Sequence, residues 1–135
     1  MSEGAVRKVG EVAEATGLSI RTLRHYDELG LVVPSGHTAG GFRLYTDEDV
    51  ERLLLVRRMK PLGFSLERMK EFLQATDVLA ADRRAGEAGP GRGGIDAARA
   101  TVEEIRAEAE ARYRDLQVQL DYATEFLHLV RQQLD

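Results

Sequence analysis

The feature that most constrains this chain is its C-terminal segment from Ile95 to Asp135, which contains neither glycine nor proline. Apolar residues recur along it at steps of three and four, the spacing that places side chains on one face of a helix. A helix of this length spans about 60 Å. A small domain cannot cover so long an apolar stripe, so the pattern predicts a partner helix, most simply that of a second copy of the chain.

The apolar stripe consists of two sets of residues, joined by an extra step of four between Ala109 and Tyr113. Such a stutter locally relaxes a left-handed supercoil but leaves a continuous seam. The acidic run EEIRAEAEAR is typical of the solvated face of such a helix. We expect the dimer interface to consist of Val102, Ile105, Ala109, Tyr113, Leu116, Leu120, Ala123, Leu127, Val130 and Leu134.

Three regimes of composition divide the chain. Short periodic segments separated by turn residues extend to about Thr76, and the stretch DVLAADRRAGEAGPGRGG that follows is rich in glycine towards its end. Such a composition resists packing. We therefore expect a compact domain over residues 1–76, a flexible linker over 77–94 and a dimerisation helix over 95–135.

Composition and charge limit the classes of function. The chain has no cysteine, which excludes disulfides, thiolate metal sites and iron–sulfur clusters. No run approaches the roughly 18 apolar residues of a membrane span, and MSEGAVRKVGEV lacks the apolar core of a signal peptide, so we expect a cytoplasmic protein. The net charge of −4 argues against nucleic acid as a partner, but residues 1–76 hold 11 basic and 11 acidic side chains, so the excess acidity lies in the C-terminal part.

The segment 9–28 has the pattern of a helix-turn-helix. Residues 9–16 have helical periodicity, Gly17 interrupts it, and Ser19 can cap the helix that follows. In this motif the second helix enters the major groove of DNA, where arginine pairs with guanine or phosphate. The alternative is a helical hairpin with a solvated charged face. The outward face of the second helix carries Arg21, Thr22 and His25.

A hairpin is expected after the second helix. Leu31–Val33 and Phe42–Tyr45 have the composition of short strands, and the glycine-rich SGHTAGG between them suits the loop. Alternation places Arg43 and Tyr45 on the same face, from which they would project together as a wing that contacts DNA phosphates. The alternative for Tyr45 is a partly buried aromatic that caps the small core.

Two more helices are predicted from their capping residues. Thr46, with Asp49 three positions later, resembles a capping box, although aspartate replaces the usual glutamate. Pro61 ends this helix, and Ser65 caps the next. Basic residues usually face solvent, but a cluster beside this turn, after a helix-turn-helix and a wing, favours a second wing that touches phosphates. The cluster consists of Arg57, Arg58 and Lys60.

Residues 6 to 76 resemble the DNA-binding domain of the MerR family of bacterial transcription regulators. The strings RTLRHYDELGLVVPSGHTAGGFRLYTDEDVERL and MKPLGFSLERMKEFL carry the resemblance. It implies a mainly α fold, with a winged helix-turn-helix domain followed by a long dimerisation helix that forms an antiparallel coiled coil. It also implies a homodimer that binds an inverted-repeat promoter site and distorts the DNA so that RNA polymerase engages both promoter elements.

The resemblance assigns DNA contacts by position, and it departs from the family at one of them. His25 stands where the family commonly has a second aromatic, which makes its contact with DNA a separate question. The assigned residues are Arg21, Arg24, Tyr26, Arg43, Tyr45 and Lys60, to which the residue pattern adds Ser19, Thr22, His25 and Arg58.

The effector is left open by the sequence. Metal-sensing relatives use cysteines that this chain lacks, so we expect neither a metal site nor a cofactor. A small-molecule effector, a protein partner on the helix and the absence of any effector all stay as alternatives. The alternative function is an effector-free repressor, or an architectural DNA-binding dimer whose C-terminal helix recruits another protein. No nucleophile elbow, phosphate loop or metal pair suggests an enzyme. Four ring-bearing residues could line a pocket, although their spacing favours coiled-coil core: Tyr113, Tyr122, Phe126 and His128.

Overall fold

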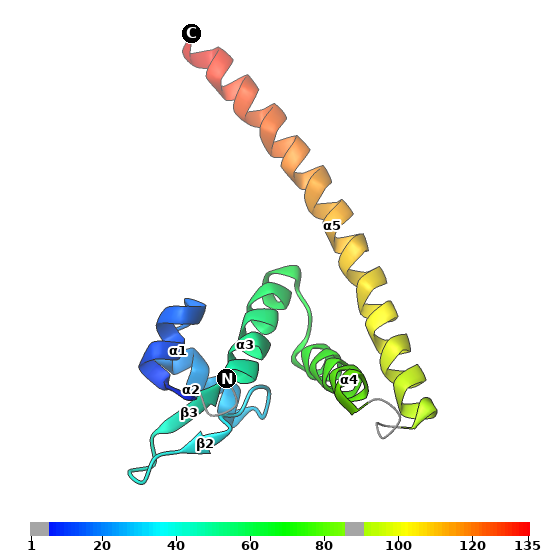
Figure 1. The fold of residues 1–135 in the computed structure, drawn as a ribbon. Helices are drawn as coiled ribbons and strands as arrows, with labels where there is room; N and C mark the ends of the chain where they lie inside the picture. The colour runs from blue at the N-terminus through cyan, green and yellow to red at the C-terminus, as the bar shows by residue number, and fades with distance from the viewer. Residues whose placement is uncertain (1–5, 86–90) are drawn as a thin grey trace. The chain divides into compact units, whose positions relative to one another are not determined.

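The structure is a computed structural model that describes residues 6–85 and 91–135 (Figure 1). The chain divides into two units, Met1–Leu73 and Gln74–Asp135. The fold is mainly helical with one small antiparallel sheet, as the sequence predicts. In chain order its elements are β1 (Val6–Lys8), α1 (Val9–Thr16), α2 (Ile20–Glu28), β2 (Gly36–His37), β3 (Arg43–Thr46), α3 (Asp47–Met59), the 3₁₀ helix η2 (Lys60–Leu62), α4 (Leu66–Ala85) and α5 (Arg92–Leu134).

The helix-turn-helix consists of α1 and α2, and both predicted turn signals are confirmed. Gly17 ends α1 with a φ of 72°, a left-handed conformation that glycine adopts without a steric penalty. The Ser19 hydroxyl oxygen caps α2 by accepting a hydrogen bond from the Thr22 N–H at 3.0 Å. Helices α1 and α2 therefore meet through a tight turn whose geometry is set by two local residues.

The sheet differs from the predicted hairpin. Its strand order is β1-β3-β2, with Val6 opposite Thr46 and His37 opposite Arg43. The expected strand Leu31–Val33 is wrong, because this segment completes the end of α2: the N–H groups of Leu31 and Val32 donate to the Tyr26 carbonyl. The strand that pairs with β3 starts later, at Gly36, and β1 adds a third strand that the sequence did not suggest.

The core of the first unit is formed by side chains from its four α-helices, from β3 and from the loops between them. Helices α1 and α3 pack against each other and against β3. The helical periodicity of each segment supplies one buried stripe, so the small domain closes around a single core. The buried apolar residues are Val12, Leu23, Tyr26, Leu31, Val32, Tyr45, Val50, Leu53, Val56, Met59, Phe64, Met69 and Leu73.

A buried carboxylate closes the base of the wing. Asp49 is 2% exposed and forms the predicted capping box with Thr46, whose N–H donates to Asp49 Oδ2 at 3.0 Å. The same oxygen accepts from the Ser35 N–H at 3.1 Å and from the Ser35 hydroxyl at 2.6 Å. Ser35 precedes β2 and Thr46 ends β3, so one side chain at the start of α3 ties both ends of the wing together.

The expected linker is shorter than the composition suggested. Helix α4 begins at its predicted cap, where Ser65 Oγ accepts from the Arg68 N–H, and continues to Ala85. The alanines and arginines of 77–85 favour helix, which outweighs the change in composition at Asp77. Helix α5 begins at Arg92 rather than at Ile95. Residues 86–90 of the predicted linker lie outside the described residues.

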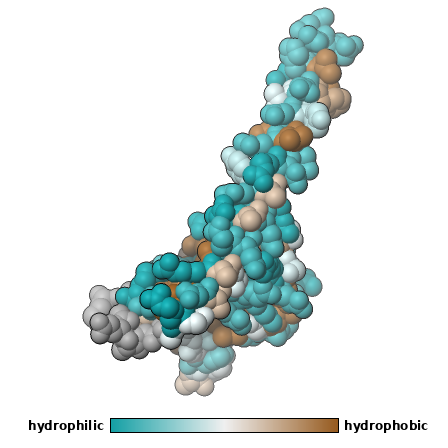
Figure 2. Space-filling view, turned by 90° about the vertical axis from the view of Figure 1, so that its right-hand side faces the viewer, coloured by the Kyte–Doolittle hydropathy of each residue, from teal (hydrophilic) through white to brown (hydrophobic). Residues whose placement is uncertain are grey.

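The second unit contains the long helix α5. Ala98 and Ile105 are buried by the chain itself, which corrects the expectation that Ile105 belongs to the dimer seam. Every residue from Tyr113 to the end of the helix is exposed, and Figure 2 shows hydrophobic residues spaced along this length among hydrophilic ones. The apolar stripe therefore divides into a first part covered within one chain and a second part that is open.

None of the helices within residues 6–85 and 91–135 is long and apolar enough to cross a membrane.

We expect Asp49→Ala to lower the free energy of unfolding by about 2 kcal/mol, because the Ser35 and Thr46 donors on both sides of the wing lose a buried charged acceptor. Glu51→Ala is the matched control, since Glu51 is an exposed acidic residue of the same helix, and its effect should stay within about 0.5 kcal/mol. Urea unfolding followed by circular dichroism measures both. Equal midpoints for the two variants would contradict the role of Asp49 as the clamp of the wing.

Candidate nucleic-acid interface

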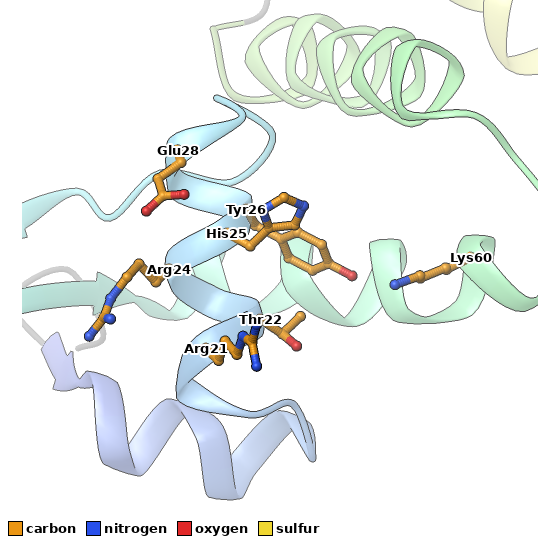
Figure 3. Close-up of a pocket in the computed structure, with 7 residues that line it drawn as sticks. All are labelled: Arg21, Thr22, Arg24, His25, Tyr26, Glu28 and Lys60. Carbon is orange, nitrogen blue, oxygen red and sulfur yellow. The ribbon is translucent and has the colours of Figure 1, made fainter.

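The outer face of α2 and the start of η2 enclose a shallow surface hollow of about 490 Å³. Figure 3 shows Lys60 pointing from η2 towards the side of α2 that carries Tyr26, while Arg24 and Glu28 project from the other side of the helix. The hollow therefore has basic groups on both sides. Its lining residues are Arg21, Thr22, Arg24, His25, Tyr26, Glu28 and Lys60.

The hollow brings together six of the ten residues expected to contact DNA. They come from positions that are far apart in the sequence, because Lys60 follows α3 whereas the other five belong to α2. Arginine and lysine side chains that converge on one exposed surface suit the phosphates and base edges of a nucleic acid. The expected contact residues outside the lining are Ser19, Arg43, Tyr45 and Arg58.

Ser19 and Thr22 support the start of α2 as well as facing outward. The Ser19 hydroxyl caps the helix and also donates to Thr22 Oγ1 at 2.9 Å. His25 is exposed, and its ring lies 6.5 Å from that of Tyr26, measured between centroids. The aromatic ring of Tyr26 is itself buried, so it braces the helix from within while the edge of the hollow stays polar.

The basic residues of the cluster beside Pro61 have two different placements. Arg57 Nη1 donates to the Thr16 carbonyl oxygen at 2.9 Å, so this guanidinium caps the C-terminus of α1. The Arg57 side chain therefore turns to the helix-turn-helix, a contact that the sequence did not predict for this member of the basic cluster. Arg58 is exposed and Lys60 lines the hollow, so these two residues keep the expected outward placement.

Arg43 lies on the wing but is held by the recognition helix. Its Nε donates to Asp27 Oδ2 at 2.8 Å, and both side chains are about three-quarters covered. The hydrogen bond with Asp27 raises the pKa of the Arg43 guanidinium above its ordinary value. An ion pair thus joins β3 to α2, a contact that the sequence did not predict.

Tyr45 does not project from the wing. Its side chain is fully buried, because β3 is the central strand and α1 and α3 cover this face. The expectation of an outward phenol beside Arg43 was wrong, and the alternative of a core aromatic is confirmed. Burial raises the pKa of the Tyr45 phenol above its ordinary value of 10.0, although the nearby charge of Arg43 acts in the opposite direction. Phe42, which directly precedes β3, is 68% exposed.

Glu28 is the lining residue that sequence reasoning missed. It is the only carboxylate among the seven residues of the hollow, and it lies one helical turn beyond Arg24 and His25. Helical spacing could have placed it there, because positions 21, 24, 25 and 28 share a face. Among the described residues, no group of three or more histidine, aspartate or glutamate side chains is arranged to hold a metal ion.

The model of the MerR HTH family of regulatory proteins matches residues 7–76, just over half of the 135 residues. The chain belongs to the MerR family. The match includes the whole helix-turn-helix, the wing, η2 and the first turns of α4.

Curated relatives match this chain over a length similar to that of the family model. The nodulation protein NolA of Bradyrhizobium elkanii is 43% identical over 72 residues, which is 53% of this chain and 33% of that protein. The HTH-type transcriptional activator mta of Bacillus subtilis is 50% identical over 66 residues, 49% of this chain and 26% of that protein. The chain thus spans about a third or less of the length of these two relatives.

A solved structure extends the similarity to nearly the whole chain. The crystal structure of HiNmlR, a MerR family regulator lacking the sensor domain and bound to promoter DNA, is 26% identical with a TM-score of 0.70. The similarity covers 95% of this chain and 92% of HiNmlR. The MerR fold therefore extends beyond the residues that the family model matches.

Removal of the Tyr45 hydroxyl should change how stability depends on pH. Because the phenol has a raised pKa in the folded protein, its contribution is complete below pH 10 and is lost as the pH rises through the folded value. Tyr45→Phe should therefore reduce the loss of folding stability above pH 10. At pH 7 it should change the free energy of unfolding by less than about 1 kcal/mol. Denaturant unfolding at a series of pH values measures this. Tyr122→Phe, at an exposed site of α5, should behave as the wild type, and an equal effect of both variants would contradict the assignment.

Proposed function

We propose that this protein is a DNA-binding transcriptional regulator of the MerR type. In this proposal a homodimer binds an inverted-repeat promoter site and controls transcription by distorting the DNA. The observation that carries the proposal is the hollow in which Arg21, Arg24 and Lys60 converge on the exposed face of α2. HiNmlR, which has a similar fold over most of its length, was crystallised on promoter DNA, and this supports the same class of ligand here.

The roles in DNA binding divide between bases and phosphates. Arg21 and Thr22 lie in the first turn of α2, the part of a recognition helix that meets base edges in the major groove. Arg58 lies in the last turn of α3, and Lys60 follows that helix at the rim of the hollow, where flexible cations suit phosphates. Arg43 on the wing adds a further phosphate contact. The negative Glu28 within a basic surface suits a cytosine amino group rather than the backbone.

The homodimer is proposed from the open part of the α5 stripe. From Tyr113 onward its apolar residues are exposed, among them Leu120 at 66% and Leu127 at 50%. So many exposed apolar side chains on one helix face favour burial against a second helix. The proposed seam now consists of Tyr113, Leu116, Leu120, Ala123, Leu127, Val130 and Leu134.

Control of transcription follows from the energy of deforming DNA. A two-fold dimer holds two recognition helices at a fixed separation, so half-sites lie whole helical turns apart. Bending or untwisting such a site costs a few kcal/mol, and changes in dimer geometry are large enough to tip that balance. RNA polymerase in the cytoplasm is the proposed partner that senses the distorted DNA.

An effector-free regulator is the second candidate. It is supported by the similarity of 95% of the chain to a regulator that lacks the sensor domain. The two candidates differ in one measurement: DNase footprints on a selected promoter change with added metabolite extract if an effector exists and stay constant if none does.

The first experiment is selection of bound fragments from a genomic DNA library at near-physiological salt. Enrichment of an inverted repeat between promoter elements is the expected result. Retention of no particular sequence would overturn the proposal that the hollow is a specific DNA-binding surface.

Arg21 and Lys60 should differ when each is replaced by alanine. Arg21→Ala should lower affinity for the selected site by about 1 to 3 kcal/mol and leave mixed-sequence duplex much less affected. Lys60→Ala should weaken binding to every sequence and reduce the slope of log K against log salt by about 1. Fluorescence anisotropy titrations on both duplexes measure these effects. If the two variants lost equal affinity on all sequences, Arg21 would be only a phosphate contact.

Leu127→Asp should convert the dimer to a monomer, because it places a charge within the proposed apolar seam. Gln132→Asp is the control with the same new side chain, and it lies about 140° around the helix from Leu127. Sedimentation equilibrium of the full chain distinguishes them. A Leu127→Asp protein that stays dimeric would contradict the seam.

A further inference from the structure

The ion pair between Asp27 and Arg43 links two elements that the proposed function uses separately. Asp27 lies near the end of the recognition helix α2, and Arg43 begins strand β3 of the wing. Their contact joins Arg43 Nε to Asp27 Oδ2 at 2.8 Å. The side chains are 28% and 24% exposed, so the pair is largely shielded but still reaches solvent.

The geometry of the pair leaves part of the arginine unused. A guanidinium has five N–H donors in a rigid planar fork, and Asp27 engages only the one on Nε. Within residues 6–85 and 91–135, Nη1 and Nη2 of Arg43 have no hydrogen-bond or ion-pair partner. These two nitrogens form the edge that binds two oxygens of a phosphate side by side.

We propose that Asp27 is a positioning residue that orients Arg43, so that its Nη1 and Nη2 edge receives a phosphate of the DNA lying against α2. This inference rests on the proposed function and adds to it a fixed distance between the wing and the recognition helix. The carboxylate removes the rotational freedom of a long side chain before DNA arrives, which lowers the entropic cost of the contact. It acts through Arg43 and does not itself touch the DNA.

The sign of the effect separates this proposal from simple electrostatics. Asp27 places a negative charge near a surface that is meant to meet phosphates, so its neutralisation alone would tighten binding. The positioning role demands the opposite result. Glu28 provides the matched comparison, because it is the next residue of the same helix, is exposed, and acts on Arg43 through its charge alone, whereas Asp27 also accepts a hydrogen bond from it.

The experiment measures binding of a mixed-sequence duplex as a function of salt, with Asp27→Asn, Glu28→Gln, Arg43→Ala and the double variant Asp27→Asn with Arg43→Ala. We expect Asp27→Asn to weaken binding about 3- to 10-fold, the scale of one hydrogen bond, and to reduce the salt slope by about 1, as Arg43→Ala does. Glu28→Gln should tighten binding. The double variant should bind no more weakly than Arg43→Ala alone.

Two results would overturn the inference while leaving the proposed function intact: tighter binding by Asp27→Asn, or a loss that persists when Arg43 is already alanine. Wild-type protein that binds no duplex would instead refute the proposed function. If Asp27→Asn does not fold, Arg43→Lys tests the positioning role instead. The single ammonium of lysine cannot bind the Asp27 carboxylate and a phosphate at the same time, as the planar guanidinium of arginine does. Arg43→Lys should therefore bind DNA as weakly as Arg43→Ala. Wild-type affinity in Arg43→Lys would refute the positioning role.

Discussion

The hydrogen bonds of the buried Asp49 carboxylate are the interaction on which the arrangement of the first unit depends. This single side chain starts α3, closes the wing at Ser35 and Thr46, and so fixes where β3 runs. Helix α3 then acts as a strut with the wing at its beginning and Lys60 just after its end. Removing a charge from water is costly, and it is tolerated here because several donors surround the oxygen. As a result, the wing, helix α3 and Lys60 have a fixed arrangement.

Local signals in the sequence were sufficient for the helices. Ser19, Thr46 with Asp49, and Ser65 all cap the helices predicted for them, because each cap depends on residues within one turn. The sheet was harder, since strand β1 is defined by pairing with residues about 40 positions later. The alternation of the strand predicts that Arg43 and Tyr45 share a face, but it does not predict which face of the strand turns inward. That depends on the packing of α1 and α3 onto β3.

The sequence predicted most residues of the candidate site but few of the contacts that these residues form. Six lining residues follow from helical spacing and position, whereas the inward turn of Arg57 and the pairing of Arg43 with Asp27 needed three dimensions. Long cationic side chains have many rotamers, so sequence alone places their backbone but not their charged end. The same limit applies to α5, where Ile105 shares the stripe of Leu120 but is covered by its own chain.

The strand order β1-β3-β2 also governs the order in which the protein can assemble during synthesis. Strand β1 leaves the ribosome first, but its hydrogen-bonding partner β3 is the last strand to be made. At about 5 to 20 residues per second, β1 waits about 2 to 8 seconds for β3. Helices α1 and α2 have 8 and 9 residues, and isolated helices of this length are marginal in water, so both lack their stabilising contacts in that interval. The recognition helix and the wing therefore gain their spacing together, once β3 has been made.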